Sequence, residues 1–219
     1  MSTHIVVQGE HLSSIAKKYG FPTYKLIWDH PQNAALKKER QNPNVIFPGD
    51  KLFIPEARQK QVGRSTGQTH RFVLKTDTLK LRLVLEDLYE KPIDNAECEL
   101  AVDGQVFKLK TDGKGKIEQV IAPDARAATL TIKDPRTPNN GVAIPIRIGD
   151  MDPVDKESGQ KARLNNLGYF AGPLDGRTAQ ENQALFVSAV EEFQCDHSLT
   201  VDGKCGPATQ AKLKQVHGC

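Results

Sequence analysis

The chain has 219 residues, of which 38% are hydrophobic and 26% are charged, and its formal net charge at pH 7 is +3. This length favours two or three small domains over one large hydrophobic core. The basic excess is weak and Lys and Arg are interleaved with acidic residues, which argues against a nucleic-acid-binding protein. The apolar runs are too short to span a membrane.

The first residues, MSTHIVVQGEHL, lack a basic segment followed by an apolar stretch, so the sequence predicts no signal peptide. The four cysteines form no CxxC pair and no zinc-like set. Three of them lie within the last 25 residues. A disulfide among Cys195, Cys205 and Cys219 therefore stays open beside reduced thiols.

The first compositional zone, residues 1–56, predicts the order strand, helix, helix, strand. HIVVQ has strand propensity, and Gly9 supplies a turn. The spacing of apolar residues from Leu12 to Tyr19 predicts a helix that ends at Gly20. A second helix is expected from Thr23 to the residue before Pro31, residues 33–41 add a further helical turn or two, and KLFIP is a strand. The two end strands are expected to pair antiparallel.

Residues 57–68 are polar and without periodicity, which predicts a linker. Residues 69–150 then alternate apolar and polar side chains over several short runs, with turn residues between them. ECELAV and QVFKLK flank Asp103-Gly104, a combination typical of a tight hairpin. This zone predicts a small antiparallel β-sandwich.

Residues 151–219 predict three helices after an acidic connector. GQKARLNNLG reads as a helix that Gly168 ends, and apolar residues from Phe186 to Phe193 mark a second. Pro207 suits the first position of a third. Two Asp-Gly turns, in GPLDG and TVDGKCGPAT, indicate a duplicated helical unit. The fold class is therefore an α+β multidomain chain.

The sequence carries no motif of a hydrolase, a nucleotide-binding loop or a metalloprotease. Its six histidines are scattered, and none has a second ligand at helical spacing, so we expect no metal site and no cofactor. Cys98 lies in a predicted strand and is expected to be a buried structural thiol. The chain is predicted not to be an enzyme.

The first zone closely resembles a LysM domain, a small βααβ module that binds glycans containing N-acetylglucosamine. VVQGEHLSSIAKKYGF and NPNVIFPGDKLFIP carry the resemblance. The matching residues are Val6, Gly9, Glu10, Leu12, Ile15, Ala16, Tyr19, Gly20, Asn44, Ile46, Pro48, Gly49, Leu52, Ile54 and Pro55.

The resemblance implies a shallow glycan groove between the first strand–helix turn and the loop before the last strand. It places Gly9, Glu10, His11 and Leu12 on one wall and Asn44, Ile46, Pro48 and Gly49 on the other. The alternative is that Leu12 and Ile46 are core residues and that Gly9 and Gly49 are turn glycines. Residues 29–43 are longer than the usual connection, so an extra helical segment is expected to reshape or cover the groove.

The last zone resembles the three-helix peptidoglycan-binding domain that many cell-wall hydrolases carry. The matching residues are Leu164, Leu167, Gly168, Tyr169, Asp175, Gly176, Phe193, Gln194, Leu199, Asp202, Gly203, Gly206, Thr209 and Leu213. Its implied binding residues are Tyr169, Asp175, Gly176, Gln194, Asp202 and Gly203. Phe193 is expected in the core, and Tyr169 at the surface.

The middle zone looks like the immunoglobulin-like or transthyretin-like domains used as spacers in bacterial surface and secretion proteins. The order of the three zones resembles proteins associated with type VI secretion and other contractile injection systems. The leading hypothesis is a non-catalytic peptidoglycan-binding protein, made in a bacterial cytoplasm and delivered to the periplasm by such an apparatus. An adaptor that binds a spike or effector protein, and an unrecognised cell-wall hydrolase, are the alternatives.

Overall fold

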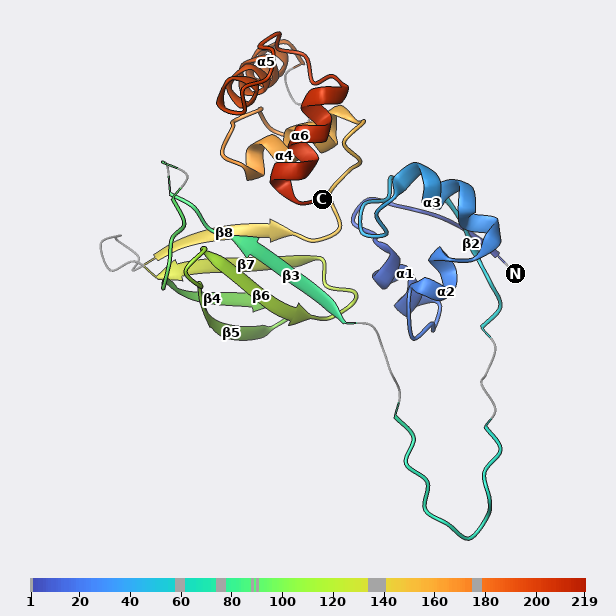
Figure 1. Ribbon diagram of the computed structural model, residues 1–219. Helices are drawn as coiled ribbons and strands as arrows, with labels where there is room; N and C mark the ends of the chain where they lie inside the picture. The colour runs from blue at the N-terminus through green and yellow to red at the C-terminus, as the bar shows by residue number, and fades with distance from the viewer. Residues whose placement is uncertain are drawn as a thin grey trace. The chain divides into compact units, whose positions relative to one another are not determined.

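The computed structural model describes residues 2–57, 62–73, 78–87, 89, 91–133, 141–174 and 179–219. The chain combines helices and antiparallel sheets, as expected for an α+β protein (Figure 1). It divides into two compact units, residues 1–44 with 48–150, and residues 45–47 with 151–219. The three domain boundaries drawn from the sequence remain predictions.

The N-terminal segment has the predicted strand and helix order with an added helix. Its elements are β1 (Ser2–Ile5), α1 (Leu12–Lys18), α2 (Lys25–Trp28), the short 3-10 helix η1 (Pro31–Asn33), α3 (Ala34–Arg40) and β2 (Lys51–Ile54). β1 and β2 pair antiparallel, with His4 opposite Leu52. The strand expected over residues 4–8 instead ends at Ile5, because the chain turns over residues 7–10.

The apolar face predicted for the first helix is buried. Leu12, Ile15 and Ala16 are buried, as are Ile27 and Trp28 of α2. Burying apolar side chains on one stripe of each short helix is what stabilises helices that are too short to form alone.

The middle segment forms two antiparallel sheets. Its strands are β3 (Leu79–Val84), β4 (Glu97–Val102), β5 (Gln105–Lys110), β6 (Lys116–Ile121), β7 (Ala127–Lys133) and β8 (Gly141–Arg147). One sheet has the order β5-β4-β7-β8, and the other is the β3-β6 pair that lies across it (Figure 1). The predicted hairpin is present, since Asp103 and Gly104 both have positive φ and connect β4 to β5.

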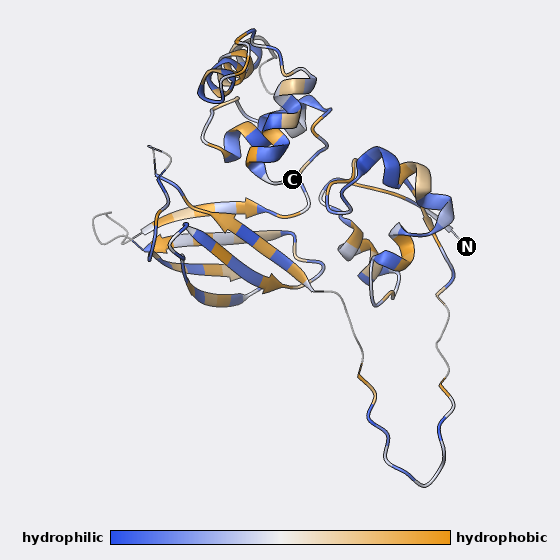
Figure 2. Ribbon diagram, in the orientation of Figure 1, coloured by the Kyte–Doolittle hydropathy of each residue, from blue (hydrophilic) through white to orange (hydrophobic). Residues whose placement is uncertain are grey.

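The two sheets share one hydrophobic core. The strands alternate hydrophobic and hydrophilic residues along their length (Figure 2). Cys98, Leu100 and Leu130 of the larger sheet are buried with Ile117 and Ile121 of the smaller one. Cys98 is thus the buried thiol that the alternation predicts, and burial raises its pKa.

The C-terminal segment contains α4 (Glu157–Asn166), α5 (Ala179–Asp196) and α6 (Pro207–His217). Pro207 stands at the first helical position, and Gly168 follows α4 with a φ of 93°. The helices surround one core of eight buried side chains: Leu164, Tyr169, Ala171, Phe186, Ala189, Val190, Phe193 and Leu213. The predicted stripe on the second helix therefore faces inward.

No helix among the described residues is long and apolar enough to cross a membrane. All four cysteines belong to the described residues and are free thiols, so the disulfide that the sequence left open is not formed in this structure.

Candidate functional site

The turn between β1 and α1 forms the first wall of the predicted groove. The backbone N–H of Glu10 donates to the carbonyl of Val7 (3.1 Å), and Gly9 between them has a φ of 82°. A side chain at residue 9 would be strained in this conformation. At the helix start, the Ser14 hydroxyl accepts from the His11 N–H (3.0 Å) and donates to the His11 carbonyl (2.7 Å).

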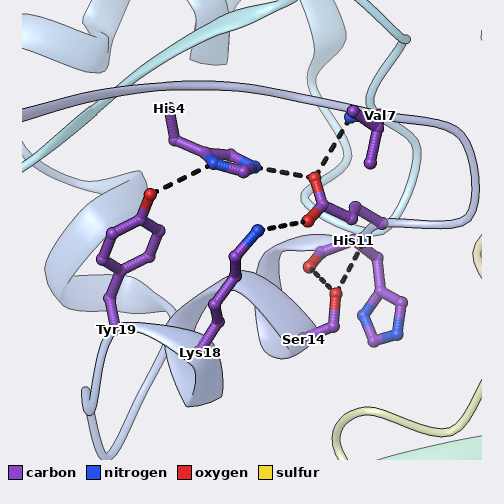
Figure 3. A network of polar contacts seen from close by, with 7 residues as sticks. His4, Val7, His11, Ser14, Lys18 and Tyr19 are labelled. Carbon is purple, nitrogen blue, oxygen red and sulfur yellow. Dashed lines mark hydrogen bonds and ion pairs between the residues drawn. The ribbon is translucent and has the colours of Figure 1, made fainter.

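The Glu10 side chain is buried and takes part in a network of polar contacts that includes His4, Val7 and Lys18. Figure 3 shows this network with those three partners labelled. One carboxylate oxygen accepts from His4 Nε2 (2.7 Å) and from the backbone N–H of Val7 (3.1 Å). The other accepts from Lys18 Nζ (3.0 Å), and the Tyr19 hydroxyl lies 3.2 Å from His4 Nδ1. The carboxylate assigned to glycan contact is thus engaged within the domain.

The environment of Glu10 favours its ionised form. Burial raises its pKa, but the hydrogen bonds from the Val7 N–H, His4 and Lys18 outweigh burial, so the pKa lies below its ordinary value. A carboxylate that accepts a backbone N–H and two cationic or polar donors contributes to the geometry of the turn.

His11 is the least satisfied polar residue of the turn. Its side chain is only 2% exposed, and neither ring nitrogen has a hydrogen-bond partner among the described residues. Burial lowers the pKa of His11, which favours the neutral form of the ring. Leu12, fully buried, is a core residue as the alternative interpretation of the groove had it.

Backbone hydrogen bonds bring the second predicted segment beside the turn. The Leu12 N–H donates to the Pro43 carbonyl (3.3 Å), the Val6 N–H donates to the Asp50 carbonyl (3.0 Å), and the Gly49 N–H donates to the Val6 carbonyl (2.9 Å). In this segment Asn44 and Gly49 are exposed and Pro48 is half-buried. Ile46 is buried, so the alternative core assignment holds for its side chain.

The long connection over residues 29–43 is an ordered structural element. The Asn33 side chain, 1% exposed, donates to the carbonyls of Ile27 and Phe53 and accepts from the Phe53 N–H, each at 2.8 Å. Farther along, Arg40 Nε and Nη2 donate to the two carboxylate oxygens of Asp50, both at 2.8 Å. The connection therefore bonds to the strand and loop that follow it.

The described Asp-Gly turn of the C-terminal segment is organised by Gln194. The Gln194 amide nitrogen donates to Asp202 Oδ1 (2.8 Å), and its oxygen accepts from the N–H groups of Asp202 (2.9 Å) and Gly203 (3.1 Å). Gln194 is 1% exposed, so this predicted binding residue contacts the loop and is covered from solvent. Asp202 is exposed, and the bonds from Gln194 and from the Lys204 N–H lower its pKa.

Tyr169 corrects an expectation from the sequence. Its ring is 8% exposed and meets Phe193 edge-on, and its hydroxyl donates to Asp196 (2.9 Å). The exposed aromatic at this turn is the next residue, Phe170, at 66%. Only one of two adjacent aromatics after the helix fills the core, and the sequence does not show which.

Asp175 and Gly176, the predicted binding residues of the first Asp-Gly turn, lie outside the described residues. Among the described residues, no group of three or more His, Cys, Asp or Glu side chains is placed to hold a metal ion. The described geometry thus offers two turns, at Gly9 and at Asp202, that are held by hydrogen bonds.

Comparison with protein families gives two matches, one in each terminal segment. Residues 4–27 match the LysM domain family, and residues 160–213 match a family described as a peptidoglycan binding domain. Both families are binding domains, so the matches support peptidoglycan binding. The LysM match runs from His4 in β1 to Ile27 in α2 and does not reach the second predicted wall. Neither the curated proteins nor the solved structures gave a match.

Sequence reasoning missed the exposed apolar side chains that flank these turns. Val7 is 52% exposed beside the Glu10 turn, and Val201 is 53% exposed beside Asp202. With Phe170 they are exposed apolar side chains that lie next to these turns in the chain. Their sequence signal is weak, because Val7 and Phe170 adjoin Val6 and Tyr169, which the family pattern already uses, and Val201 is a single apolar residue between Thr200 and Asp202.

Proposed function

We propose that this protein is a non-catalytic peptidoglycan-binding protein that engages the glycan through both terminal segments. The observation that supports it is the pair of family matches at residues 4–27 and 160–213, separated by a segment that builds its own core. Two weak sites on one chain gain avidity when both reach the same polymer.

The proposed LysM groove uses the Gly9 turn and the exposed Asn44 and Gly49. Backbone groups and the Asn44 amide would read the acetamido groups, while Val7 covers a sugar face. In the C-terminal segment, the Asp202 turn and the exposed rings and chains of Phe170 and Val201 supply the corresponding surface.

The test is sedimentation of the full chain with insoluble peptidoglycan, with N-acetylglucosamine oligomers as competitors. Asn44→Ala and Phe170→Ala alter exposed side chains of the two sites, and Val106→Ala, an exposed residue of β5, is the control. Each single variant is expected to weaken retention, and the double variant is expected to lose about 100-fold or more, since avidity is lost with both sites.

Ionic adsorption is the outcome that would overturn the proposal. The chain carries a net charge of +3, and an anionic cell wall attracts such a protein without a specific site. Retention that vanishes in about 1 M salt, where the screening length is about 3 Å, and that ignores the oligomers would show adsorption only.

Delivery by a contractile secretion apparatus, from the cytoplasm to the periplasm, is a further part of the proposal. Its support is the resemblance of the domain order alone. Detection of the chain in the medium of cells with a working apparatus, and its absence after the sheath is inactivated, tests it. The adaptor alternative predicts instead a stable complex with a spike or effector protein that survives Asn44→Ala and Phe170→Ala.

A further inference from the structure

Arg40, the last residue of α3, forms a charged pair with Asp50 that is shielded from water. The Arg40 and Asp50 side chains are 6% and 8% exposed, although α3 itself has no buried residue. Arg40 Nε and Nη2 each donate to one carboxylate oxygen of Asp50, at 2.8 Å, in a two-point fork. Such forks fix orientation as well as distance, which a single lysine contact does not.

Asp50 is placed where this fork controls the second wall of the groove. Its backbone carbonyl accepts from the Val6 N–H, and the neighbouring Gly49 N–H returns a bond to the Val6 carbonyl. Gly49 has a φ of 94° and is exposed, so this residue of the Pro48–Asp50 loop contributes no side-chain packing. The Arg40 fork substitutes for that packing.

A second connection runs from the same helix end to the first wall. After Arg40 the chain reverses at Gln41, with a φ of 60°, and the Pro43 carbonyl accepts from the Leu12 N–H. The end of α3 is therefore bonded to both sides of the groove within a few residues.

We propose that Arg40 and Asp50 are positioning residues, and that the extra helix α3 presets the Pro48–Asp50 loop for the glycan. This inference rests on the proposed function. When a loop is ordered before the ligand binds, binding no longer carries the entropic cost of ordering it. The Arg40–Asp50 pair therefore raises the affinity for the glycan without contacting the sugar. The long connection then serves to hold the groove in shape.

The experiment compares Arg40→Lys and Arg40→Met with Lys37→Met in the full chain. Lys37, on the same helix, forms a solvent-exposed ion pair with Asp29 and is the matched control. Affinity for an N-acetylglucosamine tetramer is measured by calorimetry under conditions where every variant is folded. Amide hydrogen exchange is measured without ligand at Gly49 and Val6, with the Tyr19 amide, bonded inside α1, as the global reference.

Arg40→Met is expected to lower the affinity about tenfold through a less favourable binding entropy, and Arg40→Lys by less, since lysine keeps the charge without the fork. Exchange at Gly49 and Val6 is expected to rise in the same order while Tyr19 is unchanged. Lys37→Met is expected to match the wild type in both.

If amide exchange at Gly49 is unchanged in the folded Arg40→Met variant, Arg40 does not order the Pro48–Asp50 loop and the proposal is wrong. If amide exchange at Gly49 is faster in Arg40→Met but the affinity for the tetramer is unchanged, Arg40 orders the loop without a role in binding, and the proposal is wrong. If the wild-type chain does not bind the tetramer, the proposed function of the LysM segment is wrong, and so is the role of Arg40 in glycan binding. The amide exchange measurements on the Arg40 variants still decide whether Arg40 orders the Pro48–Asp50 loop. Equal acceleration at Tyr19 would mean general destabilisation and would also overturn a positioning role.

Discussion

Gln194 and Asp202 are joined by two hydrogen bonds, and each residue is the donor in one of them. The Gln194 amide nitrogen donates to the Asp202 carboxylate at 2.8 Å, and the Gln194 oxygen accepts from the Asp202 backbone N–H at 2.9 Å. Because the same oxygen also accepts from Gly203, one buried amide from α5 fixes the whole Asp-Gly turn before α6.

Replacing this amide is expected to loosen the turn. Gln194→Leu leaves several polar groups of the loop without their protein partner, which costs about 2–3 kcal/mol of stability. Gln183→Leu, an exposed position in the same helix, is the control. Urea unfolding and amide exchange at Gly203 measure the effect, and equal stabilities of the two variants would contradict it.

The Glu10 network is expected to make the N-terminal segment less stable in acid. The pKa of Glu10 is lower in the folded state than in the unfolded chain, so its contribution is present above about pH 4.5. That contribution is lost as the pH falls through the folded-state pKa, since the unfolded state then binds more protons. Glu10→Gln should flatten this part of the pH profile.

Trp28, the one tryptophan of the chain, is buried in this segment, so its fluorescence reports the unfolding of the N-terminal segment. Asp29→Asn removes a carboxylate that is 53% exposed, in a surface ion pair with Lys37, and serves as the control. At pH 7, Glu10→Gln should cost about 1–3 kcal/mol because a charge-assisted network is weakened. A pH profile identical to the wild type would show that Glu10 does not hold the turn.

Two glycines in one turn are expected to respond differently to alanine. Gly115 has a φ of 69°, and a Cβ there would overlap the carbonyl oxygen of Leu85, whereas a Cβ at Gly113 meets nothing within 4 Å. Gly115→Ala should therefore destabilise the two-sheet segment by about 2–4 kcal/mol. Gly113→Ala should change its stability little, and thermal unfolding of both variants provides the comparison.

His217 is expected to couple the C-terminal segment to pH. Burial, with the nearby charge of Arg163, lowers the pKa of His217 to about 4 from its usual 6.5. The folded state therefore loses stability as the pH falls from about 6.5 to about 4, by at most about 3 kcal/mol for this half-buried ring. An NMR titration of the His217 ring gives the pKa directly, and a midpoint near 6.5 would refute the prediction.

Much of the fold could be predicted because local patterns report local geometry. The alternation of residues 79–85 indicated a strand, Asp103-Gly104 a hairpin, and the spacing from Leu12 to Ala16 a buried helix face. Each of these signals lies within a few residues, where backbone sterics and one-sided burial decide the outcome.

The candidate site was less predictable, since its side chains are fixed by distant partners. Nothing local to Glu10 shows that its carboxylate meets His4 and Lys18 inside the domain, and nothing local to Tyr169 shows that it, and not Phe170, meets Phe193. In a sequence, a polar residue of a family pattern that contacts a ligand cannot be distinguished from one that holds a loop in place. Their hydrogen-bond partners distinguish the two.

The sequence by itself determined the order of helices and strands, the turns between them and the two family matches. Only the tertiary structure decided that Arg40 donates two hydrogen bonds to Asp50 and that Gln194 is hydrogen-bonded to the Asp202 turn. The physical reason is that secondary structure follows from short-range periodicity, whereas a buried polar side chain is positioned by whichever partner the packed chain brings within hydrogen-bond distance.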